Sequence, residues 1–239
     1  MDLSLRQKLA LTYKIASIKS WDNWTYTHMS CRNEDNTGFY INPFNCLFKD
    51  VQSSELVEVI FSQPLEQYFE LANPTGVLLH NAIYQSRSDV NSIVHLHTTA
   101  GVAVSSMKCG LLPISQFALH FYNTVSYHAY DSLVLDEKTQ CYNVAKDLEN
   151  NNVMFLENHG TISVGSSVEE AFFLTHHLEE ACKVQCLCMS CHTPLIYPSH
   201  EICQKAHADL MNFETHRGER DWNAALSLIS KADFDIVTK

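Results

Sequence analysis

The hydrophobic pattern along the chain has two periods, one typical of helices and one typical of strands. Apolar residues at helical spacing predict helices over 3–19, 77–87, 99–107, 114–121, 137–149, 168–188 and 221–230. Short apolar or β-branched runs predict strands over 24–32, 38–42, 57–61, 92–98, 124–127, 153–156 and 161–164. Because the two kinds of element alternate, and some strands form hairpin-like pairs, we expect an α/β fold with a mixed sheet between helices.

The start of the longest predicted helix carries a recognisable capping pattern. Ser167 stands where an N-cap residue is expected, and Glu170 stands at the N3 position of a capping box. No internal repeat, low-complexity tract or linker interrupts the chain. We therefore expect residues 1–239 to form a single domain.

Composition narrows the classes of partner. The chain has 239 residues with a net charge of −11, and an acidic surface disfavours nucleic acid and anionic membranes. No apolar run approaches the length of a bilayer span, and the N-terminal residues lack the apolar core of a signal peptide. The nine cysteines are an odd number, which favours reduced thiols over a disulfide framework. We expect a cytoplasmic protein with no nucleic-acid partner and no membrane span.

The candidate chemistry begins in the strand predicted over 92–98. His95 and His97 are two positions apart, so their side chains share one face, with Cα atoms about 6.6 Å apart. His159 lies at the end of another predicted strand, before Gly160, which we expect to permit a sharp reversal. Three histidines with one open coordination position are typical of a catalytic site for zinc or another divalent metal. The alternative is that each is a structural histidine.

A second group of ligand-type residues lies near the end of the longest predicted helix. Cys182 and Cys186 are four positions apart, and Cys188 and Cys191 precede His192 in the pattern of a haem-attachment site. Haem attachment requires export, so we discount it. A zinc or redox site stays open, but we favour the interpretation that Cys182 and Cys186 are small core residues.

Three blocks of the sequence resemble the class II aldolase/adducin family, and specifically the adducin head and its bacterial relatives. The blocks are AIY and RSDVNSIVHLH (82–84 and 87–97), MKCGLLPISQ (107–116), and NHG followed by G and VEEAF (158–160, 165 and 168–172). The resemblance covers about 5–188 and leaves 189–239 as a C-terminal extension. It implies a three-layer α/β/α fold with a largely antiparallel sheet. It also implies zinc ligands at His95, His97 and His159, and a homotetramer with active sites between subunits.

The sequence departs from the sugar-phosphate aldolases of this family at the positions that do chemistry. The family's catalytic Glu falls on Gly76, and its phosphate-binding Gly-Asn is replaced by Tyr26-Thr27, followed by His28. Phe44 replaces a small residue in the second phosphate-binding segment. A positioned general base contributes about 10²–10⁴-fold to a rate, so we expect slow aldol chemistry at best.

Four further residues are expected near the metal or in the pocket beside it: His28, Gly76, His80 and Asn158. His80 lies one helical turn beyond Gly76 on the same face. It could hold a water or a substrate oxygen, or it could serve packing alone. The sequence does not identify the catalytic base.

Two functions are consistent with these residues. The first is a metal-dependent enzyme that acts on a small oxygenated substrate, as an aldehyde-lyase or in a related decarboxylation or epimerisation. The second is a catalytically silent binding or assembly module like the adducin head, with actin-associated partners. The absence of adducin's basic C-terminal tail from this acidic sequence weakens the second hypothesis.

Overall fold

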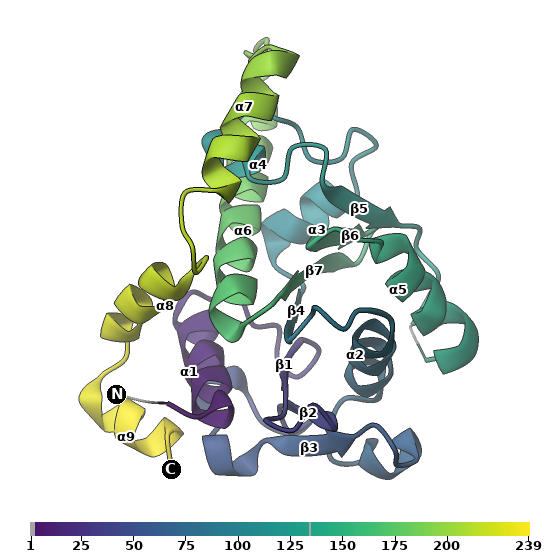
Figure 1. Cartoon of the computed structure of the whole chain (residues 1–239). Helices are drawn as coiled ribbons and strands as arrows, with labels where there is room; N and C mark the ends of the chain where they lie inside the picture. The colour runs from purple at the N-terminus through teal and green to yellow at the C-terminus, as the bar shows by residue number, and fades with distance from the viewer. Residues whose placement is uncertain (1–2, 134) are drawn as a thin grey trace.

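A single seven-stranded sheet organises the described residues, 3–133 and 135–239, of the computed structural model (Figure 1). The strands are β1 (His28–Arg32), β2 (Gly38–Ile41), β3 (Val57–Ile60), β4 (Ser92–Leu96), β5 (Val125–His128), β6 (Val153–Leu156) and β7 (Gly160–Gly165). Their order is β3-β2-β1-β4-β7-β6-β5. All the neighbouring strands pair antiparallel except β5 and β6, which are parallel. The expected mixed and largely antiparallel sheet is confirmed.

Helices cover both faces of this sheet. The helices are α1 (Leu5–Ile18), α2 (Pro74–Ser86), α3 (Thr99–Ser105), α4 (Gln116–Leu119), α5 (Tyr142–Leu148), α6 (Val168–Ser190), α7 (His200–Met211), α8 (Glu219–Ala225) and α9 (Lys231–Val237). Figure 1 shows α2 and α5 on one side of the sheet and α1 and α6 on the other, which confirms the three-layer architecture. Short 3₁₀ segments at 48–50, 53–55, 65–68 and 226–228 and a π-helical turn at 137–141 complete the chain.

The period-two geometry of the strands assigns side chains to the two faces. In β4, Ile93 packs in the core under α2 and α5, whereas Val94 and Leu96 pack in the core under α1 and α6. In β1, Met29 and Cys31 also belong to the α1 and α6 side. The side chains between them, including those of His28 and His95, therefore face α2.

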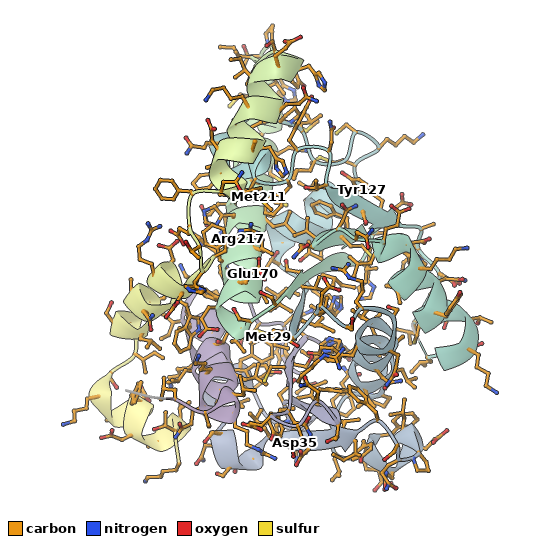
Figure 2. All side chains as sticks on the ribbon, viewed as in Figure 1. Met29, Asp35, Tyr127, Glu170, Met211 and Arg217 are labelled. Atoms are coloured by element: carbon orange, nitrogen blue, oxygen red, sulfur yellow. The ribbon has the colours of Figure 1, made fainter. Side chains whose placement is uncertain are left out.

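The C-terminal part of the chain is anchored on α1 and α6. Trp222 of α8 is buried, and its indole N–H donates a hydrogen bond to Thr12 Oγ1 at 2.9 Å. Arg217 forms an ion pair with Glu170 at the start of α6, at 2.9 Å, and both side chains are labelled in Figure 2. The sequence did not predict α7 or α9. The helix expected at 221–230 is present as α8, which ends at Ala225 and is followed by the 3₁₀ turn at 226–228.

Local signals explain three differences from the predicted elements. The first strand begins at His28 rather than at Trp24, because Trp24 has a φ of 51° and lies in a turn. Helix α2 begins at Pro74 rather than at Val77. Asn73 caps this helix, because its side chain accepts a hydrogen bond from Thr75 N. At α6, Ser167 caps as predicted, but the Glu170 carboxylate accepts from Ser166 N instead of closing the capping box.

Within residues 3–133 and 135–239, none of the helices combines the length and apolar character that crossing a bilayer requires.

Candidate metal site

The structure brings His95, His97 and His159 together as one histidine cluster. His95 lies in β4, His97 lies just beyond the end of that strand, and His159 lies in the turn between β6 and β7. Leu96 pairs with Thr161 across β4 and β7, which places this turn beside the end of β4. One ring nitrogen from each histidine lies within 4.8 Å of the other two. The ring centroids are 4.7–5.0 Å apart.

The backbone fixes which nitrogen of His95 is available to a ligand. Its Nδ1 lies 3.0 Å from the carbonyl oxygen of Thr161. A carbonyl oxygen can only accept, so Nδ1 carries the proton and the lone pair is on Nε2. That Nε2 lies 2.9 Å from Nε2 of His97. A metal-binding histidine usually donates the N–H of its other ring nitrogen to a carbonyl or carboxylate oxygen, and this hydrogen bond orients the ring.

The electrostatics of the cluster favour neutral imidazoles, which is the form that binds metal. Burial lowers the pKa of His95 well below its ordinary value, and the neighbouring His97 lowers it further. Burial and the neighbouring His159 lower the pKa of His97 to about 4. Burial also lowers the pKa of His159.

The donor set fits a tetrahedral divalent ion. Zinc–nitrogen bonds of about 2.0–2.1 Å place two imidazole nitrogens about 3.3 Å apart in tetrahedral geometry. The Nε2 atoms of His95 and His97 are 2.9 Å apart, and the ligand atoms of all three histidines lie within 4.8 Å of one another, so the rings would rotate to hold one ion. His95 is buried, whereas His97 and His159 are half-buried, so the cluster has one side toward solvent. Three protein ligands would leave a coordination position for water or substrate.

The turn that carries His159 differs from the prediction. The residue in the left-handed region is Asn158, with a φ of 57°, and Gly160 is not in that region. Gly160 is required for close approach instead, because a Cβ there would collide with the carbonyl oxygen of Leu96 and lie 2.9 Å from the His97 ring. Asn158, expected beside the pocket, donates its backbone N–H to Ser105 O at 3.3 Å and so holds the turn in place.

Three of the residues expected near the metal lie together on the α2 side of the cluster. His28 is directly opposite His95 across β1 and β4, and their ring centroids are 4.9 Å apart. Its ring lies against Gly76, where a Cβ would approach ring atoms to 2.8 Å. His28 Nδ1 is 2.9 Å from Nε2 of His80. The space that a side chain at position 76 would need is therefore filled by His28.

Two residues of this region were not identified from the sequence. Ser30 Oγ lies 2.6 Å from Nδ1 of His80 and 2.8 Å from the hydroxyl of Tyr84. Two spacings in the sequence could have indicated these residues. His28 and Ser30 are two positions apart in a strand, and His80 and Tyr84 are four positions apart in a helix, so the members of each pair lie on the same face.

The fold and the cluster define an α/β protein with a three-histidine candidate metal site at the ends of neighbouring strands. The chain belongs to the family described as the Class II Aldolase and Adducin N-terminal domain, whose profile matches residues 7–186. This match confirms the resemblance carried by the three sequence blocks.

Individual relatives support the family assignment by sequence and by structure. Alpha-adducin of Rattus norvegicus is 42% identical over 186 residues, which are 76% of this chain but only 25% of adducin. The structure of an aldolase II superfamily protein from Pseudomonas syringae superposes with a TM-score of 0.88 at 34% identity, over 97% of this chain and 94% of that one. L-fuculose 1-phosphate aldolase from Glaciozyma antarctica PI12 has a TM-score of 0.83 at 23% identity, over 98% and 92%. At that identity the likeness shows the fold alone.

Proposed function

We propose that the chain binds one divalent metal ion, zinc or an ion of similar preference, through His95, His97 and His159. The observation that carries the proposal is the convergence of the His95 and His97 Nε2 atoms at 2.9 Å, with the proton of His95 held on Nδ1 by Thr161. The lone pair of His95 Nε2 therefore faces His97 Nε2, which can either donate an N–H to it or join it in binding a cation.

We further propose that this site handles a small oxygenated molecule, in an aldehyde-lyase reaction or a related decarboxylation or epimerisation. A divalent ion, when bound, supplies a Lewis acid that polarises an oxygen atom of the substrate. The chain itself orients His95 through Thr161 and keeps His97 and His159 half-buried beside an open side. Homotetramer formation with shared sites is part of the same proposal.

Two observations favour a second candidate function, a binding or assembly module without turnover. Position 76 carries glycine, and the adjacent space is filled by the His28 ring, so no carboxylate acts from that position. The sequence is also 42% identical to the matching quarter of alpha-adducin. In this module the metal would hold a ligand or fix the local structure.

The metal proposal is tested by elemental analysis of the purified protein and of His95→Ala. We expect about one divalent ion per chain in the wild type and almost none in the variant. His120→Ala is the matched control, because His120 is a buried histidine outside the cluster. A wild-type protein that takes up no metal, or a His95→Ala variant that keeps it, would contradict the proposal.

The two candidate functions are separated by turnover. The metal-loaded protein is incubated with a panel of hydroxy-aldehydes, hydroxy-ketones and β-keto acids, and retro-aldol cleavage and decarboxylation are measured. Product formation that is lost in His95→Ala supports the enzyme. Full metal occupancy with no turnover across the panel supports the binding module.

A further inference from the structure

A chain of hydrogen-bonded side chains leads from the histidine cluster into the core under α2. It runs from His28 to His80, then to Ser30 and then to Tyr84, with contacts of 2.9, 2.6 and 2.8 Å. All four residues are buried, with exposures of 0–2%. Apolar residues of the core surround the Tyr84 end of the chain, so a hydrogen at that end must find its acceptor within the chain.

One direction of the chain leaves no hydrogen unpaired at its Tyr84 end, and it leaves the one unpaired hydrogen on His28. The hydroxyl of Tyr84 has no hydrogen-bond partner among the described residues other than Ser30. Tyr84 must therefore donate to Ser30, because the reverse would leave a buried O–H without an acceptor. Ser30 has a single hydrogen, which it then donates to Nδ1 of His80.

The same argument fixes both rings. Burial lowers the pKa of His80 to about 3, so this ring is neutral and has one N–H. Since its Nδ1 accepts from Ser30, the hydrogen is on Nε2 and is donated to Nδ1 of His28. The hydrogen of His28 is therefore on Nε2.

The Nε2 of His28 is at the end of the chain that lies beside the cluster. It makes no hydrogen bond with a described residue, yet it is not one of the buried polar atoms that lack a partner. His28 as a whole is only 1% exposed, so this N–H has little contact with bulk water. The ring lies 4.9 Å from that of His95, between this metal-ligand candidate and Gly76.

We propose that His28 is a ligand-binding residue whose Nε2–H, oriented through His80 and Ser30 by Tyr84, donates a hydrogen bond to an anionic oxygen of the molecule that binds at the histidine cluster. This inference rests on the proposed metal site and narrows its ligand to a small molecule that presents an anionic oxygen, such as a carboxylate. A donor fixed in advance loses little freedom on binding, which favours developing negative charge on such an oxygen. Ser30 and Tyr84 act through His80 and are positioning residues.

The test uses the protein loaded with cobalt(II), whose visible absorption reports both metal occupancy and ligand entry, with oxalate as the probe. His28→Ala should bind cobalt as the wild type does but raise the dissociation constant of oxalate about tenfold or more, the usual effect of losing a hydrogen bond to a charged group. His28→Gln, which keeps an N–H donor, should recover part of the affinity. Tyr84→Phe should raise the constant a few-fold. Tyr68→Phe is its control, because Tyr68 lies in the same core but outside the chain.

A second measurement does not depend on the variants folding. Long-range ¹H–¹⁵N correlation spectra of the histidine-labelled wild type report which ring nitrogens carry hydrogen. We expect a hydrogen on Nε2 of both His28 and His80. A bare Nε2 on His28, or unchanged oxalate affinity in a well-folded His28→Ala, would overturn the inference and leave the metal proposal intact. Failure of the wild type to bind cobalt would instead overturn the metal proposal.

Discussion

Two groups of histidines in this protein pack ring against ring, and they differ in what their nitrogens contact. The histidine cluster (His95, His97 and His159) has ring centroids 4.7–5.0 Å apart. The helical pair (His120 and His177) is closer still, at 4.2 Å. Within the described part of the chain, however, the cluster is the one place where three such ligand atoms converge. Close packing of imidazole rings alone therefore does not bring three ligand atoms together.

The difference lies in how the backbone holds the rings. In the cluster, a strand end and an adjacent turn aim three rings at one point, and Thr161 fixes the hydrogen of His95. In the helical pair, both rings pack on Phe173, with centroids 5.5 and 4.0 Å from it. His177 donates its Nδ1–H to the carbonyl of Phe173, whereas Nδ1 of His120 is buried without a described partner. The rings of the pair contact each other and Phe173, whereas the cluster brings three ligand atoms together.

The largest expected difference is in stabilisation by metal. Zinc in free excess at about 100 times its dissociation constant should stabilise the fold by about 2.7 kcal/mol. For a chain of this size that corresponds to a rise in melting temperature of about 5–10 °C. Differential scanning calorimetry with zinc and with a chelator measures it. His97→Ala should abolish the rise and His120→Phe should keep it. A rise that survives His97→Ala would place the ion elsewhere.

Acid should destabilise the fold through its buried histidines. The pKa of His80 is lowered to about 3 by burial, so between pH 6.5 and 3 the unfolded chain binds a proton that the folded chain does not. Stability is therefore fully present above pH 6.5 and falls as the pH decreases, by roughly 2 kcal/mol from this group between pH 6.5 and 5. Urea unfolding at several pH values measures the slope.

The helical pair should contribute to the same slope without affecting metal binding. Burial, together with the neighbouring His177, lowers the pKa of His120 to about 3. His120→Phe should make the pH dependence shallower and leave zinc affinity unchanged. An identical slope in this variant would show that the pair does not resist protonation as its burial implies.

The smallest expected effect concerns the contact between Gly76 and His28. Gly76→Ala places a methyl group 2.8 Å from the His28 ring, and the crowding should cost about 1 kcal/mol of unfolding free energy. Gln85→Ala, at an exposed position of the same helix, should change stability by less than about 0.5 kcal/mol. The variant should also displace the His28 signals in NMR spectra. A Gly76→Ala protein as stable as the control, with unmoved signals, would show that the space beside His28 is open.

The sequence predicts the histidine cluster better than it predicts the surroundings of that cluster. His95 and His97 follow from the period of a strand, and the family resemblance supplies His159. The contacts of His28 with His80 and of Ser30 with Tyr84 join residues more than fifty positions apart, so no local pattern contains them. Helix α7 was missed because the segment after Pro194 is polar, and its one buried residue is Cys203. The left-handed Asn158 was missed because the adjacent Gly160 is the more usual residue for a reversal.

The most direct test of the metal assignment is X-ray absorption at the zinc edge of the zinc-loaded protein. Three imidazole nitrogens of the histidine cluster at about 2.0–2.1 Å, with an oxygen in the remaining position and no sulfur, are the predicted result. The measurement is decisive because Cys186, Cys188 and Cys191, near the end of α6, are all free thiols and offer the competing site. A sulfur shell at about 2.3 Å would assign the ion to those cysteines and contradict the account.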